Sequence, residues 1–120
     1  MAKTVLVVDD EIDLLDIVRI WLTENGYKTI LAENGVDALE KLKEGLPNLI
    51  LLDIAMPGMD GFELLQRIRR NPNTAQMPVV MLTARGDTSA IMESQRLRAT
   101  DYLTKPVELH DLISTIQRYI

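Results

Sequence analysis

Five polar side chains in this sequence stand where apolar runs end, and their types suit chemistry on a phosphoryl group. Asp9 and Asp10 directly follow the first apolar run of the chain, Asp53 ends the third, Thr83 ends the fourth, and Lys105 ends the fifth. None of the five is a Cys or a His, so neither thiolate nor imidazole chemistry is indicated. Any site that they form therefore contains three carboxylates, a hydroxyl and an ammonium.

A divalent cation would complete this set of side chains. Three carboxylates held close together repel one another, and one ammonium offsets only part of their charge. Carboxylate, carbonyl and water ligands favour Mg²⁺, which usually binds one or two carboxylates plus a phosphate. The segment Asp9–Asp13 lacks the central Gly of an EF-hand loop, and the chain has no Gly-rich Walker loop for a nucleotide. The predicted cofactor is therefore Mg²⁺.

The reaction that these groups support is phosphoryl transfer to an Asp carboxylate. A carboxylate can attack phosphorus and become an acyl phosphate. Because the transition state of this transfer is loose, catalysis consists mainly of positioning and charge neutralisation. Mg²⁺ and the Lys105 ammonium would neutralise the phosphoryl oxygens, and the Thr83 hydroxyl would supply a directional hydrogen bond.

The elements that must position these groups alternate along the chain. Short apolar runs predict five strands, and apolar residues at helical spacing predict a helix after each strand. Breakers such as Gly26, Gly45 and Pro47 stand at the predicted helix ends. The predicted strands are Thr4–Asp9, Tyr27–Glu33, Asn48–Asp53, Pro78–Thr83 and Asp101–Thr104, and the predicted helices are Ile12–Asn25, Gly35–Lys43, Phe62–Arg70, Ser89–Arg98 and Leu109–Tyr119.

This alternation predicts one α/β domain over residues 1–120, with a parallel sheet covered by helices on both faces. Its strands are almost continuously apolar, whereas antiparallel strands with one solvated face would alternate apolar and polar residues. In a doubly wound parallel sheet, the functional crevice lies outside the carboxyl ends of the strands. The five polar side chains are therefore expected to meet at one edge of the sheet.

Charge and composition exclude several other classes of function. The net charge is −5; residues 1–60 carry 12 acidic and 5 basic side chains, and residues 61–120 carry 6 acidic and 8 basic ones. This acidity argues against direct nucleic-acid binding, which needs a clustered basic face. The basic run Arg67–Arg70 is interpreted as a helix C-terminus, where cations complement the helix dipole. With no Cys, no signal-peptide pattern and no membrane-length apolar run, a cytoplasmic location is expected.

Four segments together resemble the signature segments of bacterial response-regulator receiver domains. They are "VLVVDDE", "LLDIAMPGMDG", "VVMLTA" and "DYLTKP", in order and with ordinary spacing over essentially the whole chain. The resemblance implies a flavodoxin-like doubly wound (βα)5 fold with a sheet of order 2-1-3-4-5. It also implies a phosphorylation-activated switch of a two-component system, with intrinsic autophosphorylation and autodephosphorylation, rather than an enzyme.

The resemblance assigns the phosphoacceptor and the metal ligands. Asp53 would receive a phosphoryl group from a phosphohistidine on a sensor histidine kinase or a phosphotransfer protein. Asp9, Asp10, Asp53 and the Ala55 backbone carbonyl would hold Mg²⁺, Asp10 directly and Asp9 through water.

The resemblance also assigns a switch and an output face. Thr83 and Lys105 would contact the phosphoryl group, and Tyr102 would move inward behind Thr83. The bond between Lys105 and Pro106 would be cis. Output would pass through the fourth helix, fifth strand and fifth helix to an effector or attached domain that the sequence does not specify. A homodimer through that face is one option that the family offers.

Three features depart from the family pattern. Arg98 stands where Gly is common, so a left-handed backbone there would cost about 1 kcal/mol unless the helix ends differently. Val107 stands where Phe is common. Ala55 and Arg85 occupy variable positions that set the dephosphorylation rate, and Ala55 has no polar side chain to position an attacking water.

Simpler interpretations of single residues remain open. Asp9 and Asp10 could cap the first helix, Thr83 could be an ordinary strand-end hydroxyl, and Lys105 a surface ammonium. Only their joint placement favours a site. Tyr102 could be an ordinary half-buried strand residue.

Other side chains are expected to be structural. Glu11 and Asp13 are interpreted as capping and surface acids, and His110 as solvent-facing. Trp21 and the Met residues are interpreted as core or near-core residues.

Two other functions fit parts of the pattern. A phosphohydrolase of the haloacid dehalogenase type also uses an aspartyl nucleophile and Mg²⁺, but its two acids follow the first strand as DxD and it has a cap domain. A binding module could keep the fold and lose phosphotransfer, but the acids, Thr83 and Lys105 argue against that loss.

Overall fold

The computed structural model describes residues 2–120, in which strands and helices alternate as the sequence predicts. Predicted and observed element boundaries differ by at most two residues, as expected from the fraying of helix and strand ends. The strands are β1 (Thr4–Val8), β2 (Lys28–Ala32), β3 (Leu49–Asp53), β4 (Val79–Ala84) and β5 (Asp101–Lys105). The helices are α1 (Ile12–Glu24), α2 (Gly35–Glu44), α3 (Gly61–Arg70), α4 (Thr88–Arg96) and α5 (Leu109–Tyr119).

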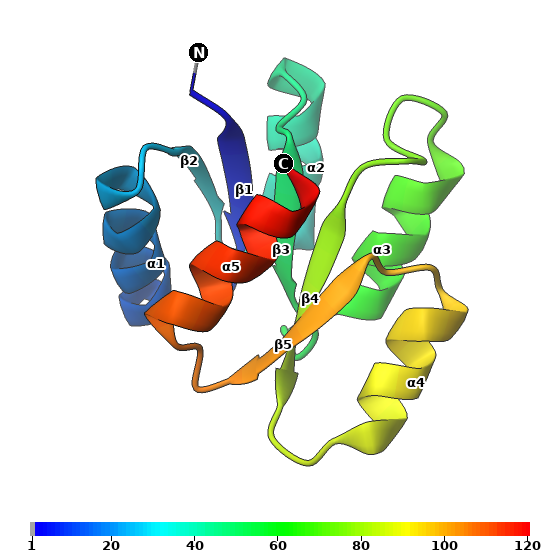
Figure 1. Cartoon of the computed structure of the whole chain (residues 1–120). Helices are drawn as coiled ribbons and strands as arrows, with labels where there is room; N and C mark the ends of the chain where they lie inside the picture. Colours follow the sequence, from blue (N-terminus) through cyan, green and yellow to red (C-terminus); the bar gives the residue numbers. More distant parts are fainter. Residues whose placement is uncertain (1) are drawn as a thin grey trace.

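The strands form one parallel sheet in the order β2-β1-β3-β4-β5, which confirms the predicted flavodoxin-like topology (Figure 1). All five residues of the central strand β3 are buried, because helices cover both faces of the sheet. This explains why the strand has no polar alternation in its sequence. The register pairs Val8 with Leu52 and Leu52 with Met81, so these three strands end close to one level.

Two apolar cores fix the helices to the sheet. Helices α1 and α5 pack on one face through buried residues that include Leu15, Leu22 and Ile116. Helices α2 and α3 pack on the other face through Ala38 and Leu64, and the end of α4 contacts the same core. This layered arrangement leaves the carboxyl ends of the strands, with the loops that follow them, along one edge of the molecule (Figure 1).

The end of α4 settles which of two predicted conformations Arg98 adopts. The helix ends at Arg96, and Arg98 has φ 66°, in the left-handed region. The N–H of Ala99 donates to the Ser94 carbonyl at 2.9 Å, and that of Arg98 donates to the Gln95 carbonyl at 3.0 Å. These two bonds make a Schellman motif, whose left-handed position usually holds Gly. The backbone conformation is therefore kept without the glycine that would make it unstrained.

The predictions for scattered large side chains are mostly confirmed. Met81 is buried, Trp21 packs partly buried against a core, and His110 is exposed. The prediction was wrong for Met92, which is 69% exposed on α4 because it lies on the face of that helix turned away from the sheet. No helix among residues 2–120 is long and apolar enough to cross a membrane.

Candidate functional site

Asp9 lies fully buried directly after β1. Its N–H donates to the Ala32 carbonyl at 3.1 Å, which extends the pairing of β1 with β2 by one bond. Its Oδ1 accepts a hydrogen bond from the Glu11 N–H at 2.9 Å. Its Oδ2 accepts no hydrogen bond from residues 2–120, although Lys105 Nζ lies 3.1 Å away in an ion pair. A buried oxygen of this kind is uncommon in folded proteins and fits a position meant for a cation.

Asp53 ends β3 and is 3% exposed. Its Oδ1 lies 3.2 Å from Lys105 Nζ and accepts a 3.4 Å hydrogen bond from the Ala55 N–H. The start of α3 packs directly on the Asp53 backbone, because a Cβ at Gly61 would come within 2.3 Å of the Asp53 carbonyl oxygen. Gly58 has φ 75°, so a second glycine in this loop also adopts a conformation that a side chain would strain. Gly61 therefore lets the start of α3 pack on the Asp53 backbone, and Gly58 lets the loop turn before it.

Lys105 and Thr83 complete the same edge from β5 and β4. The Lys105 ammonium lies within 3.2 Å of three carboxylates, those of Asp9, Glu11 and Asp53. Burial lowers the pKa of Lys105, but the carboxylates raise it more, so its pKa lies above the ordinary value. Thr83 is 1% exposed, and its hydroxyl donates a long 3.4 Å bond to the Ala84 carbonyl. The Lys105–Pro106 peptide bond is cis, the isomer that the resemblance implies.

The acids at this edge form a compact cluster. Asp9, Asp10 and Asp53 each place one carboxylate oxygen within 4.8 Å of the others, and Asp10 alone is exposed to solvent. Burial and the neighbouring Asp9 carboxylate raise the pKa of Asp53 to about 6, against the opposing effect of Lys105. The ionised cluster is therefore short of positive charge.

The residues of this cluster fit a divalent cation. The donors are carboxylate oxygens, the ligand type that suits Mg²⁺, and they lie close enough for one ion to contact all three. The Asp9 oxygen without a hydrogen bond would gain a partner, and the exposed Asp10 leaves the site open toward solvent. The sequence-predicted ligands Asp9, Asp10 and Asp53 are thus brought together by the fold.

Glu11 is an exposed surface acid, as expected, but it also lies next to the acidic cluster. It occupies the N-cap position of α1, but its side chain makes no capping hydrogen bond. Its Oε1 instead accepts a hydrogen bond from Lys105 Nζ at 3.1 Å. The interpretation as a capping acid was therefore wrong. The Glu11 carboxylate binds the Lys105 ammonium at the end of β5 and not the N–H groups at the start of α1.

Tyr102 lies on β5, where it pairs in register with Met81, and its side chain is 38% exposed. Its N–H is bonded at 2.8 Å to Asp101 Oδ1, at the start of the same strand. The side chain therefore lies toward solvent on the outer face of β5, while Thr83 is enclosed on the neighbouring strand.

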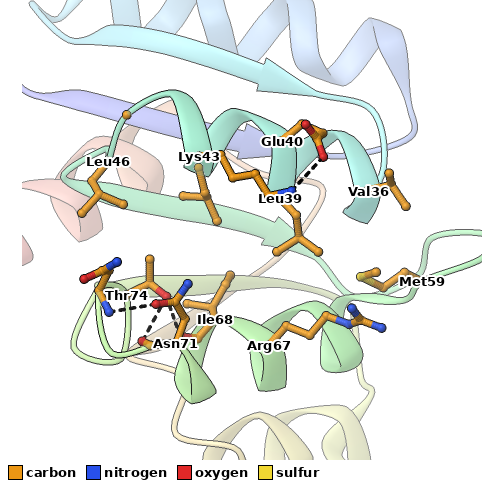
Figure 2. Close-up of a pocket in the computed structure, with 13 residues that line it drawn as sticks. Val36, Leu39, Glu40, Lys43, Leu46, Met59, Arg67, Ile68, Asn71 and Thr74 are labelled. Atoms are coloured by element: carbon orange, nitrogen blue, oxygen red, sulfur yellow. Dashed lines mark hydrogen bonds and ion pairs between the residues drawn. The ribbon is translucent and has the colours of Figure 1, made fainter.

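Two larger hollows lie beside the acidic edge rather than within it. A groove of about 760 Å³ runs between α2 and α3, where Leu39 and Ile68 face each other and Arg67 and Lys43 border it (Figure 2). A second hollow of about 770 Å³ adjoins the site, because Asp10 is one of its lining residues. None of the buried acids lines either hollow, so the chemistry is expected at the open edge of the sheet.

Comparison with known proteins identifies the family. The sequence model of the response regulator receiver domain matches residues 5–117. An uncharacterized 14.6 kDa protein of Leptolyngbya boryana is 41% identical over 115 residues, which is 96% of this chain and 88% of that protein. The phosphate regulon transcriptional regulatory protein PhoB of Escherichia coli is 38% identical over 117 residues, 98% of this chain. This chain spans only 51% of PhoB, about half of its length.

A solved structure agrees with the sequence comparisons. The crystal structure of a putative response regulator from Chloroflexus aurantiacus superposes with a TM-score of 0.96 at 34% identity, and the match covers 99% of this chain and 98% of that one. The chain belongs to the response-regulator receiver-domain family. Receiver domains are regulatory phosphoacceptor domains of two-component systems, not enzymes in the usual sense.

Proposed function

We propose that Asp53 is the phosphoacceptor of a signalling switch, with Asp9, Asp10, Asp53 and the Ala55 carbonyl as the protein ligands of Mg²⁺. The observation that carries this proposal is the convergence of three carboxylates within 4.8 Å beside a single ammonium. When bound, Mg²⁺ supplies positive charge that neutralises the phosphoryl oxygens.

The proposed step is an in-line transfer from the phosphohistidine of a sensor histidine kinase or a phosphotransfer protein. An oxygen of the ionised Asp53 carboxylate forms a bond to phosphorus, and the P–N bond to the donor imidazole breaks. The imidazole leaves with the electron pair and takes a proton from solvent. Lys105 lies close enough to Asp53 to bond a phosphoryl oxygen, and the rigid end of β3 fixes the direction of attack.

The proposed switch couples the phosphoryl group to the surface at the β5 side of the sheet. The Thr83 hydroxyl has only a long hydrogen bond at present and is free to move to a phosphoryl oxygen. Tyr102 would then turn inward from its exposed position, altering the surface formed by α4, β5 and α5. That surface would contact an effector, an attached output domain or a second copy of the chain.

The test is the intact mass of the protein after incubation with a small phosphodonor such as phosphoramidate, with and without Mg²⁺. The proposal predicts the gain of one phosphoryl group that requires Mg²⁺ and disappears in Asp53→Asn. Asp13→Asn is the matched control, since Asp13 is an exposed acid of α1 outside the cluster. A wild-type protein that never gains mass would contradict the proposal and favour a module that acts by contact alone.

A further inference from the structure

The ammonium of Lys105 has more acidic neighbours than the proposed chemistry uses. The ammonium lies beside three carboxylates, from Asp9 after β1, Glu11 at the start of α1, and Asp53 at the end of β3. The three N–O distances are 3.1, 3.1 and 3.2 Å. Asp9 and Asp53 belong to the acidic cluster itself, whereas Glu11 lies outside it.

The contact with Glu11 differs from the other two in geometry and exposure. It is the one ion pair of Lys105 within residues 2–120 that also has hydrogen-bond geometry. The side chain of Glu11 is 63% exposed, against 0% for Asp9 and 4% for Asp53. Its backbone is fixed by the N–H bond to Asp9 Oδ1, so the carboxylate starts from a defined position.

A phosphoryl group on Asp53 would compete for the same ammonium. The group adds several strong acceptor oxygens to those of Asp53, while the Lys105 ammonium has three N–H groups in all and already lies within 3.2 Å of three carboxylates. When two of these N–H groups bond phosphoryl oxygens, one is left for Asp9 and Glu11 together. Releasing the exposed Glu11 costs least, since water can solvate its carboxylate at once, whereas water cannot reach the fully buried Asp9 carboxylate in the same way.

We propose that Glu11 is a positioning residue that holds Lys105 in the unphosphorylated protein and releases it when Asp53 is phosphorylated. This inference rests on the proposed function of Asp53. The contact opposes phosphorylation, because Lys105 must leave Glu11 before it can bond the new oxygens. It also joins the start of α1 to the end of β5, two segments 94 residues apart, only while the protein is unphosphorylated.

The kinetic test separates this contact from simple charge repulsion of an anionic phosphodonor. Phosphorylation rates are compared for wild type, Glu11→Gln, Glu11→Asp and the control Asp13→Asn at saturating Mg²⁺. Glu11→Asp keeps the charge but shortens the side chain by one methylene, so it loses the contact. The proposal predicts that both Glu11 variants are faster by about two- to fivefold, the range of an exposed ion pair, while Asp13→Asn stays at the wild-type rate.

The ammonium itself gives a second measurement that needs neither Mg²⁺ nor a phosphodonor. In the ¹⁵N–¹H spectrum of the unphosphorylated wild type, the Lys105 NH₃⁺ signal should be visible because its exchange is slowed. The signal should weaken in both Glu11 variants and remain in Asp13→Asn. An unchanged signal in Glu11→Gln would overturn the proposal, as would a wild-type rate in both Glu11 variants.

One further pattern would overturn it in a different way. If Glu11→Gln and Asp13→Asn are both faster while Glu11→Asp behaves as wild type, charge alone acts and no specific contact exists. Failure of the proposed function looks different again, since no variant would then be phosphorylated while the ammonium signal would still report whether Glu11 holds Lys105.

Discussion

Two half-buried cations lie at opposite edges of the sheet, and they differ in the kind of partner that surrounds them. Lys105, at the carboxyl ends of the strands, faces three carboxylates. Arg69, at the end of α3, donates to neutral oxygens: the carbonyls of Arg98, Thr74, Ala75 and Met77 and the hydroxyl of Thr100.

Burial acts alike on the two cations, but their neighbours act in opposite directions. Burial lowers the pKa of each. At Lys105 the carboxylates more than reverse this effect, whereas at Arg69 the nearby Arg98 guanidinium lowers the pKa further. Arg69 remains charged, since the ordinary pKa of an arginine lies far above neutral pH.

The difference separates the proposed phosphorylation site from a structural link. The acids around Lys105 outnumber it, so that edge can accept further positive charge and exchange one partner for another. The neutral carbonyls around Arg69 satisfy its N–H groups and leave nothing to exchange. Arg69 therefore joins the end of α3 to the segments that lead into β4 and β5.

The largest expected effect is the loss of Lys105. Replacing it by Met keeps the volume but leaves the buried Asp9 and Asp53 carboxylates without a cation, which should lower the free energy of unfolding by about 3 kcal/mol at pH 8. At pH 5 the loss should be smaller, because Asp53, with a pKa of about 6, is then mostly protonated. Urea denaturation at the two pH values measures both; equal losses would contradict the role assigned to the carboxylates.

The loss of Arg69 should be nearly as large but independent of pH between 5 and 8. Arg69→Met leaves several part-buried carbonyls without donors, at an expected cost of about 2–3 kcal/mol. Arg70→Met is the matched control, since Arg70 is exposed and its guanidinium bonds only to Gln66 among residues 2–120, and it should cost less than about 0.5 kcal/mol. If both variants lose similarly little free energy of unfolding, the hydrogen bonds of Arg69 do not hold α3 to the segments before β4 and β5.

Asp53→Asn should stabilise the protein that lacks Mg²⁺. The folded pKa of about 6 lies above the ordinary value of 3.8, so the folded state holds this proton more tightly than the unfolded chain does. Stability therefore falls as the pH rises from about 4 to 6 and stays low above that. The variant should avoid this fall and gain about 1–3 kcal/mol at pH 7, with little gain at pH 4.

Mg²⁺ sharpens this third prediction. The ion stabilises the wild-type fold by binding it, and Asp53→Asn removes one of the proposed ligands. The advantage of the variant should therefore shrink as Mg²⁺ is added. Thermal melts at several Mg²⁺ concentrations measure this, and an advantage that is unaffected by Mg²⁺ would contradict Asp53 as a ligand.

The sequence predicts one of these two edges much better than the other. Apolar runs determine the strands, and polar residues directly after them must share the carboxyl edge, so Asp9, Asp53 and Thr83 could be placed from local pattern alone. The sheet order itself came from resemblance. The placement of these residues holds because the end of a strand is set by the local sequence. The direction of a long side chain is set by residues far away along the chain.

The contacts of long side chains could not be predicted in this way. Arg69 is one of three arginines near the end of α3, and nothing in that run shows which one folds back against the segment before β4. Glu11 looked like a helix cap because it stands directly before a helix. Its actual partner, Lys105, is 94 residues away and cannot be seen in the local pattern. In both cases the decisive partner is placed by tertiary structure.

The smallest expected change in stability comes from replacing Arg98, and it has two causes that can be measured separately. The residue has a left-handed backbone with φ 66°, and its guanidinium also lies near that of Arg69. Arg98→Gly removes both the backbone strain and the like charge, and should stabilise by about 0.5–1 kcal/mol despite the greater flexibility of unfolded Gly. Arg98→Ala removes the charge but keeps a Cβ in the strained position. The difference between the Gly and Ala variants therefore measures the strain.

Met92→Gly is the control for this series, because Met92 is exposed in the middle of α4 and the protein should lose about 1 kcal/mol when it is replaced. If Arg98→Ala is as stable as Arg98→Gly, the left-handed backbone costs nothing. Any gain in stability then comes from removing the Arg98 charge beside Arg69. If the Gly variant alone is stabilised, the Schellman motif bears the strain and the charge of Arg98 is screened by solvent. Equilibrium denaturation of the four proteins in low and high salt separates these outcomes, since salt screens the charge effect and leaves the backbone effect unchanged.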